Sequence, residues 1–282
     1  MLKVTDQGYP EALRNISPAP KQIYWRGLPL DDWITRPKVA VVGSRRMTEY
    51  GRLVTTRLAG ALAEAGVVVI SGLALGTDVT AHKAALRAGG TTIAVLATGL
   101  DNITPRSNYD TALQIIQKGT IISEQPPGQA VHLGLFVTRN RIISGLADIV
   151  LIPEAGLKSG SLHTARFALE QGKTVMAVPG NITSAGSEGC NNLIKSGAIP
   201  VTSPEDIFFA LKLRPGRPKT KPAHSGTPAE MKIISLLAEG IADQEELALA
   251  AGLDGGALAS ALTSLELGGQ IRPAGAGNWV IA

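Results

Sequence analysis

The chain has 282 residues, of which 44% are hydrophobic and 18% charged, and its formal net charge is +4 at pH 7. This composition predicts a globular protein with one sizeable core and room for a small second domain. The single cysteine, Cys190, excludes an internal disulfide framework, and no apolar run reaches the roughly 18 to 20 residues of a membrane helix. We therefore expect a cytoplasmic protein without a membrane segment.

The charge is distributed unevenly. Residues 211–222 carry five basic side chains and no acidic one, whereas residues 228–282 carry two basic and seven acidic ones. The excess of positive charge lies in the large domain and in segment 211–222. We expect any polyanion to bind there and not to the C-terminal domain.

Residues 1–37 contain prolines and scattered aromatics, and we expect an arm packed on the main domain. Between residues 38 and 210, apolar runs alternate with helical stretches. This alternation predicts an α/β fold, with a parallel sheet covered by helices on both faces. The predicted strands are Val39–Val42, Val67–Ile70, Thr92–Leu96, Thr120–Ile122, Ile149–Ile152 and Val175–Val178.

Small, polar or charged residues follow every one of these strands. Ligands of an open parallel sheet bind beyond the carboxyl ends of its strands. One such loop would be ordinary turn chemistry, whereas six in corresponding positions predict one extended binding edge. The loops are Gly43–Arg46, Ser71–Gly72 with Gly76–Asp78, Thr98–Gly99, Ser123–Glu124, Pro153–Glu154 with Lys158–Gly160, and Pro179–Asn181.

The loop after the first of these strands has the composition of a phosphate-binding turn. Gly43 permits a tight turn, Ser44 offers a hydroxyl, and Arg45 and Arg46 supply planar cations suited to phosphate oxygens. We expect a helix to begin at Thr48, with free amides that point to the same place.

The sequence does not indicate a cofactor or a metal. The turn lacks G-x-G-x-x-G, and the second strand ends in Ser71–Gly72 with no acid for a ribose. Gly172-Lys-Thr174 lacks the first glycine of a P-loop and precedes a strand. No pair of His or Cys residues has the spacing of metal ligands, and His82 and His163 are expected to be structural.

The tripeptide Arg139-Asn140-Arg141 begins a predicted helical stretch. By itself it could be a solvated basic turn. Since it leads into the strand at Ile149, we favour a position at the ligand-facing edge of the sheet.

Residues 158–164 combine Lys158, two serines and Gly160 at a predicted helix start. Ser159 or Ser161 could cap the helix, and the same free amides would also accept a phosphate. Both interpretations can hold together.

Glu154 is the candidate for enzymatic chemistry, because a carboxylate beside arginines can act as a general base. Alternatively it orders Arg45 or Arg139 as an ion pair. The chain has no nucleophile motif and no partner acid at a recognisable spacing, which favours the ion pair.

The rest of the chain is predicted to be a linker and a small domain. Residues 211–227 are rich in proline and basic residues, as is typical of linkers. Residues 228–282 follow a winged-helix pattern, with helices at 228–238, 243–251 and 254–267 before a hairpin. The third helix, which would enter a DNA groove, contains no Lys or Arg.

Taken together, these motifs resemble those of the DNA-processing protein A family (DprA, also called Smf). They span residues 9–198 in the family's order, and although most are weak individually, jointly they are very specific. The matching stretches are Tyr9-Pro10, Tyr24-Trp-Arg-Gly27, Val41-Val-Gly-Ser-Arg45, Thr48-x-Tyr-Gly51, Ser71-Gly-Leu-Ala-x-Gly-x-Asp78, Ala81-His82, Ser123-Glu124, Arg139-Asn-Arg-Ile-Ile143, Ser159-Gly-Ser161 with Thr164-Ala165, Val178-Pro-Gly180, and Asn191-x-Leu-Ile194 with Gly197-Ala198.

The resemblance implies a Rossmann-like domain that binds single-stranded DNA, protects incoming DNA and, as a homodimer, loads RecA recombinase in natural transformation. The DNA-contacting positions carried over by motif are Gly43, Ser44, Arg45, Gly72, Phe136, Arg139, Lys158 and Asn191. The supporting positions are Arg46, Asp78, Asn140, Arg141, Glu154, Ser159, Gly160, Ser161, Thr164 and Gly180.

The sequence departs from the family pattern at three points. Thr77 replaces the usual Ile before the aspartate, and Thr104-Pro105 replaces an expected Tyr-Pro. No N-terminal helical domain, common in the family, is predicted.

Because the large domain is poor in aromatics, we expect phosphate-dominated binding with little base preference. The acidity of the C-terminal domain predicts protein contact or autoregulation instead of duplex binding.

An enzyme is the alternative function. Related Rossmann-like proteins cleave nucleotide phosphoribosides at a glycine-rich edge with an arginine and a glutamate. Their key loop resembles P-G-G-x-G-T, whereas this chain has Pro179-Gly-Asn181, which favours the DNA-binding function.

Overall fold

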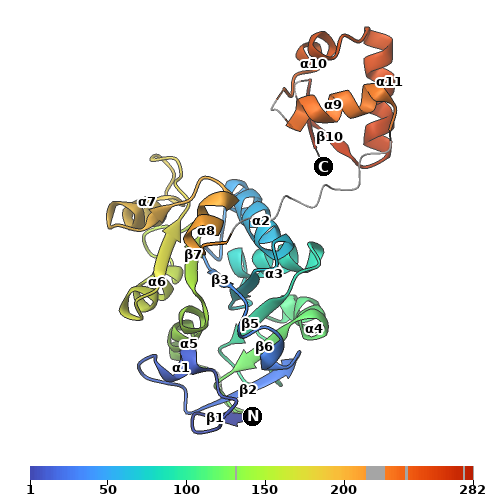
Figure 1. The fold of residues 1–282 in the computed structure, drawn as a ribbon. Helices are drawn as coiled ribbons and strands as arrows, with labels where there is room; N and C mark the ends of the chain where they lie inside the picture. Colours follow the sequence, from blue (N-terminus) through green and yellow to red (C-terminus); the bar gives the residue numbers. More distant parts are fainter. Residues whose placement is uncertain (131, 214–225, 239–240, 276, 282) are drawn as a thin grey trace. The chain divides into compact units, whose positions relative to one another are not determined.

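The computed structural model describes residues 1–130, 132–213, 226–238, 241–275 and 277–281. The chain divides into two compact units, Met1–Gly216 and Arg217–Ala282 (Figure 1). The large unit contains the binding edge that the sequence predicts.

Within the described residues of the large unit, nine strands form one sheet in the order β1-β2-β6-β5-β4-β3-β7-β8-β9. Neighbours from β6 to β9 are parallel, which confirms the predicted sheet, and the ends of the six predicted strands differ by at most one residue. The strands are β1 (Leu2–Lys3), β2 (Gln22–Gly27), β3 (Lys38–Val41), β4 (Val68–Ser71), β5 (Thr92–Leu96), β6 (Thr120–Ser123), β7 (Ile149–Ile152), β8 (Thr174–Ala177) and β9 (Ile199–Pro200).

The first 37 residues do more than pack on the main domain. Strand β2 pairs antiparallel with β6, so that Tyr24 lies opposite Ser123, and β1 pairs antiparallel with β2. The arm therefore extends the sheet by two strands, of which β1 forms the edge.

Helices cover both faces of the sheet (Figure 1). On one face, Val39 and Val41 of β3 pack against α2, α3 and α8, and α4 continues this layer over β5 and β6. On the other, Ala40 and Val42 pack with residues of α1, α5 and α6. Because both faces are buried, the strand shows no polar alternation. The helices are α1 (Glu11–Arg14), α2 (Glu49–Glu64), α3 (Thr77–Arg87), α4 (Tyr109–Lys118), α5 (Leu133–Leu146), α6 (Ser161–Glu170), α7 (Glu188–Lys195) and α8 (Pro204–Ala210).

The strand order creates a switch point between β3 and β7. From β3 the chain proceeds through β4, β5 and β6 toward one side of the sheet, and from β7 it proceeds through β8 and β9 toward the other. The loops that follow β3 and β7 consequently diverge, which is where ligands of open α/β sheets bind.

The second unit has the predicted winged-helix pattern. It consists of α9 (Pro228–Ala238), α10 (Gln244–Ala251), α11 (Gly255–Leu267) and the hairpin of β10 (Ile271–Gly275) and β11 (Asn278–Ile281). Asp243 and Asp254 cap α10 and α11 by accepting hydrogen bonds from backbone amides of the first turns. Most of the predicted linker, residues 214–225, lies outside the described residues.

Among the described residues, no helix taken singly is both long and apolar enough to cross a membrane. The pair α10 and α11 reaches the required length and composition only when joined, and its two helices are bent by 111°.

Candidate functional site

A cavity of about 530 Å³ lies at the switch point. Its walls come from the loop between β3 and α2, from α5, and from the segment that leads into α6. The cavity lining contains most of the predicted site residues, namely Gly43, Ser44, Arg45, Arg46, Asp78, Phe136, Arg139, Asn140, Lys158, Ser159, Gly160, Ser161 and Thr164. Gly72, Arg141, Glu154, Gly180 and Asn191 are not part of this lining.

The turn at Gly43 and Ser44 is held on both sides. The Ser44 amide donates to the carbonyl of Glu154 at 2.9 Å, and the Ser44 carbonyl accepts from the amide of Thr77 at 3.1 Å. A Cβ on Gly43 would lie 2.5 Å from the Thr77 Oγ1 and 2.7 Å from the Glu154 carbonyl oxygen, so no larger residue fits. The backbone of the turn is therefore fixed between the loop after β7 and the start of α3.

Three exposed cations, Arg45, Arg46 and Lys158, surround the cavity. In the described part of the chain, none of them forms an ion pair with a carboxylate. The Arg45 guanidinium carbon lies 5.7 Å from the centre of the half-buried Phe136 ring, within cation–π range. The rim thus combines unneutralised positive charge with one aromatic surface.

Arg139 differs from these cations because it is buried. Helix α5 begins six residues before it, so the expectation that the tripeptide begins the helical stretch is wrong. Its Nη1 donates to the carbonyl oxygens of Gly72, at 2.8 Å, and Val95. Burial lowers the pKa of Arg139 to about 10, opposed by the charge of Asp78 and reinforced by that of Arg45.

Asp78 lies in the first turn of α3 and is also buried. Its Oδ2 accepts from the amide of Gly72 at 3.0 Å and from that of Ala74 at 3.4 Å. Burial raises the pKa of Asp78, while Arg139 and these amides oppose the rise. Gly72 lies against Arg139, since a Cβ on Gly72 would come within 2.5 Å of the guanidinium.

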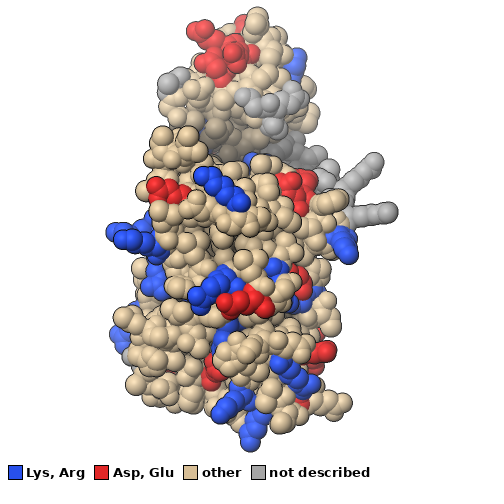
Figure 2. Space-filling view, turned by 90° about the vertical axis from the view of Figure 1, so that its left-hand side faces the viewer, with Lys and Arg blue, Asp and Glu red and all other residues tan. Residues whose placement is uncertain are grey.

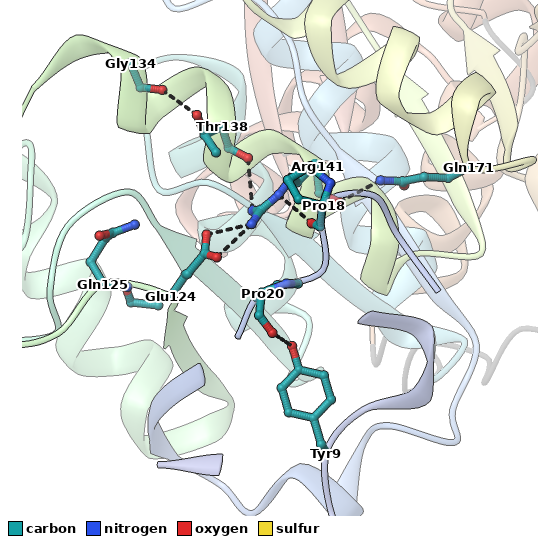
Figure 3. Close-up of polar contacts among 10 residues, drawn as sticks. Tyr9, Pro18, Pro20, Glu124, Gln125, Gly134, Thr138, Arg141 and Gln171 are labelled. Carbon is teal, nitrogen blue, oxygen red and sulfur yellow. Dashed lines mark hydrogen bonds and ion pairs between the residues drawn. The ribbon is translucent and has the colours of Figure 1, made fainter. Parts of the chain in front are cut away.

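Arg141, two residues further along α5, is turned away from the cavity toward the N-terminal arm (Figure 3). Its Nη2 donates to both carboxylate oxygens of Glu124, at 2.7 and 2.9 Å, and its Nε donates to the Pro18 carbonyl at 3.0 Å. Tyr9 donates to the carbonyl of Pro20 at 2.6 Å. Arg141 therefore fixes the arm to the sheet and is not at the ligand-facing edge, contrary to our prediction.

Glu154 orders neither Arg45 nor Arg139, so the predicted ion pair is wrong. Its buried carboxylate accepts from the Thr48 amide at 3.0 and 3.2 Å and from the Thr48 hydroxyl. The Thr48 hydroxyl in turn accepts from the amide of Gly51 at 3.1 Å. These amides at the start of α2, which we expected to face a phosphate, are thus satisfied within the protein.

Asn191 and Gly180 contact each other at the loop after β8. The Asn191 side chain donates to the Gly180 carbonyl at 3.1 Å and accepts from the Gly180 amide at 3.2 Å. A Cβ on Gly180 would lie 2.1 Å from the Ser187 hydroxyl. The oxygen and the nitrogen of the Asn191 side-chain amide are therefore both used to shape this loop.

His163 lines the cavity, although the sequence suggested a structural role. Its position two residues after Ser161, in the first turn of α6, was the available signal. His82 is buried in the core, and its Nδ1 lies 2.7 Å from the Thr92 hydroxyl. Since that hydroxyl donates to the Val69 carbonyl, it accepts from His82, and the Nε2 of His82 has no hydrogen-bond partner within the described residues.

A parallel α/β domain with a cationic cavity at its switch point, followed by a winged-helix unit, defines a class of phosphate- or nucleic-acid-binding proteins. The chain belongs to the DNA recombination-mediator protein A family, whose model matches residues 1–212. The model of the DprA winged helix domain matches residues 217–277. By family, the protein is therefore a DNA-processing protein that belongs to the recombination mediators.

Relatives agree with this assignment. DNA processing protein DprA of Streptococcus pneumoniae is 42% identical over 205 residues, which cover 73% of this chain and 72% of that protein. Protein Smf of Escherichia coli is 48% identical over 187 residues, which cover 64% of this chain but only 50% of that protein.

Two solved structures have the same fold. The X-ray structure of S. pneumoniae DprA superposes with a TM-score of 0.69 at 41% identity, covering 74% of this chain and 72% of that chain. DprA from Helicobacter pylori, described for its single-stranded DNA binding mode, gives a TM-score of 0.66 at 36% identity, covering 72% and 92%.

Proposed function

We propose that the large unit binds single-stranded DNA at the carboxyl edge of its sheet. The observation that carries this proposal is the group of three exposed cations around one cavity, Arg45, Arg46 and Lys158, which have no carboxylate partner in the residues that the structure describes. Such cations bind phosphate oxygens without reading sequence. The similarity to the H. pylori protein supports a single strand as the ligand.

The residues that we propose as DNA contacts have distinct roles. Arg45 and Lys158 bind backbone phosphates, and the Ser44 hydroxyl donates a further hydrogen bond, because its oxygen accepts from the Arg46 amide at 3.1 Å. The Phe136 ring offers one stacking surface, which any base can use. Gly72 and Asn191 act indirectly through the neighbours that they position.

The C-terminal unit takes no part in this binding. Acidic side chains gather on it in the face shown in Figure 2, whereas Lys and Arg are spread over the large unit. Helix α11, which corresponds to the groove-reading helix of a winged-helix domain, contains no basic residue. We propose that this unit contacts protein instead of duplex DNA.

The cellular role that we propose is protection of incoming single strands and loading of RecA recombinase by a homodimer. The description of the family as recombination mediators supports this role. Light scattering measures the dimer, and RecA ATPase activity on DNA covered by single-strand-binding protein measures loading. A monomeric protein that leaves the lag of RecA activity unchanged would contradict this role.

A titration of fluorescent oligonucleotides tests DNA binding. We expect the full chain to bind oligo-dT more tightly than a duplex of equal length, with an affinity that falls as salt is raised. Equal affinity for both, or none at 50 mM salt, would contradict the proposal.

The alternative, a nucleotide phosphoribohydrolase, needs a glutamate free to act on substrate. The carboxylate of Glu154 is buried and bound to Thr48, which does not favour that role. Incubation with nucleoside monophosphates tests this alternative, because base release that is lost in Glu154→Gln would support it.

A further inference from the structure

We propose that Arg139 and Asp78 are positioning residues: they hold the turn 72–76 from two sides and thereby fix Ser44 and Arg45, while Arg139 itself does not bind DNA. This inference rests on the proposed function and assigns a different task to an arginine that the family motif places among the DNA contacts. Hydrogen bonds connect α5 through this turn to the rim of the cavity.

Helix α5 contacts the turn through Arg139. Arg139 donates to the carbonyl of Gly72 at 2.8 Å and also to that of Val95, at the end of the neighbouring strand. Its Nε donates to the side chain of Asn140 at 3.2 Å. Only 6% of the residue is exposed, so most of its surface is unavailable to a strand in solution.

Asp78 holds the opposite side of the same turn. Asp78 accepts from the amides of Gly72 and Ala74, while Arg139 binds the carbonyl of Gly72. The peptide groups around Gly72 are therefore held by an anion on their donors and by a cation on their acceptor. Such charge-assisted bonds are stronger than neutral ones.

The turn contains a residue in a strained backbone conformation, which its neighbours must hold in place. Leu73 has a φ of 55°, a left-handed conformation that is strained for a residue with a Cβ. Leu73 is fully buried, and its carbonyl accepts a hydrogen bond of 2.9 Å from Asn108. A conformation of this kind persists only where several neighbours determine it.

The end of the turn contacts the backbone of Ser44, which precedes the cations Arg45 and Arg46. Gly76 has a φ of 75°, and a Cβ there would lie 2.2 Å from the carbonyl oxygen of Ser44. Thr77 binds the same oxygen through its amide at 3.1 Å and its hydroxyl at 3.2 Å. A shift of the turn 72–76 would therefore displace Ser44 and Arg45.

The experiment measures the affinity for oligo-dT against salt concentration in the full chain. Arg139→Gln and Asp78→Asn should each raise the Kd about tenfold, with a salt slope within about 0.2 of the wild type. A direct phosphate contact would instead lower the slope by about 0.7 in Arg139→Gln. A direct contact also predicts tighter binding in Asp78→Asn, because that change removes a negative charge near the arginine, whereas positioning predicts weaker binding.

Arg141→Lys is the matched control, since Arg141 lies in the same helix, is equally buried and contacts the arm instead of the turn. We expect its Kd to stay within about twofold of the wild type. Tighter binding in Asp78→Asn, a reduced slope in Arg139→Gln, or an unchanged Kd in both folded variants would overturn the inference. If Arg139→Gln fails to fold, the direction of the change in Asp78→Asn decides. A failure of the proposed function is distinguished by Arg45→Ala, which would then change neither affinity nor slope.

Discussion

Replacing Arg45 by alanine removes one exposed cation and leaves the fold of the turn intact. The guanidinium of Arg45 lies over Phe136 and has no carboxylate partner among the described residues. Its loss should therefore cost little folding stability. A hydrogen bond to a charged group contributes about 1.5–3 kcal/mol, so we expect the Kd for oligo-dT to rise about ten- to a hundredfold at low salt.

The salt dependence makes this prediction specific. One lost phosphate contact lowers the log–log slope by about 0.7 for a single strand. Over a fourfold increase in salt, from 50 to 200 mM, the affinity ratio between wild type and Arg45→Ala should shrink by about 2.6-fold. Fluorescence anisotropy at four or five salt concentrations resolves such a change.

Arg166 provides the matched control for Arg45. It is exposed on α6, and its guanidinium carbon also lies 5.7 Å from a phenylalanine ring, that of Phe167. Unlike Arg45 it pairs with a carboxylate, that of Glu170 at 3.4 Å, and it does not line the cavity. Arg166→Ala should change neither the affinity nor the slope. Equal slopes for Arg45→Ala and the wild type would refute the assignment of Arg45 as a phosphate contact.

Three further predictions concern stability and domain function. Glu154→Gln should lower the free energy of unfolding by about 1–3 kcal/mol, measured by urea titration. Both carboxylate oxygens of Glu154 accept hydrogen bonds from Thr48, and a glutamine side chain has only one such oxygen. Burial lowers the pKa of His82 to about 3. Between about pH 6.5 and 3, His82 therefore binds a proton in the unfolded chain but not in the folded chain. Stability present above about pH 6.5 is lost as the pH falls toward 3, and unfolding of His82→Gln should depend less on pH over that range than the wild type. Deletion of residues 223–282 should leave the affinity for single strands within a few fold, and a large loss would identify the winged-helix unit as a DNA reader.

Much of the fold is predictable because parallel strands that are buried on both faces consist of consecutive apolar residues. The exceptions are β1 and β9, of two residues each, and β2, whose residues Gln22–Gly27 mix aromatic and polar side chains. Its partner β6 lies about a hundred residues further along the chain, and nothing local indicates that pairing. The extension of the sheet by the arm therefore follows from tertiary structure alone.

The cavity was predictable in its location, since Gly43 to Arg46, Lys158 to Ser161 and Thr164 do line it. The orientation of the arginines was not recognised, although the sequence holds a signal for one of them. Arg139 is spaced three, four and seven residues from Ile142, Ile143 and Leu146, which is the periodicity of one buried helix face. The charge of the tripeptide favours the ligand-facing edge, but the periodicity decides where the Arg139 side chain points.

Glu154 could not be placed from the sequence for a related reason. A carboxylate near arginines in a loop list has several possible partners, and which one it meets depends on distances across the sheet. Gly51 leaves room for the carboxylate, because a Cβ there would lie 2.5 Å from the Glu154 Oε2. The pairing of a glycine on one element with an acid on another becomes visible only after folding.

The charged residues of the site thus divide into an exposed group that can meet DNA and a buried group that can shape the surface. Arg45, Arg46 and Lys158 keep their charges in solvent, where binding releases counterions. Arg139 and Asp78 use theirs on backbone groups within the protein. A rigid turn suits a ligand that is read through its backbone, because exposed cations on a mobile loop would lose conformational entropy on binding. Substitutions in the first group should change the salt slope without changing the melting temperature. Substitutions in the second should lower both the melting temperature and the affinity at a constant slope, and a plot of these quantities for all five residues separates the two roles.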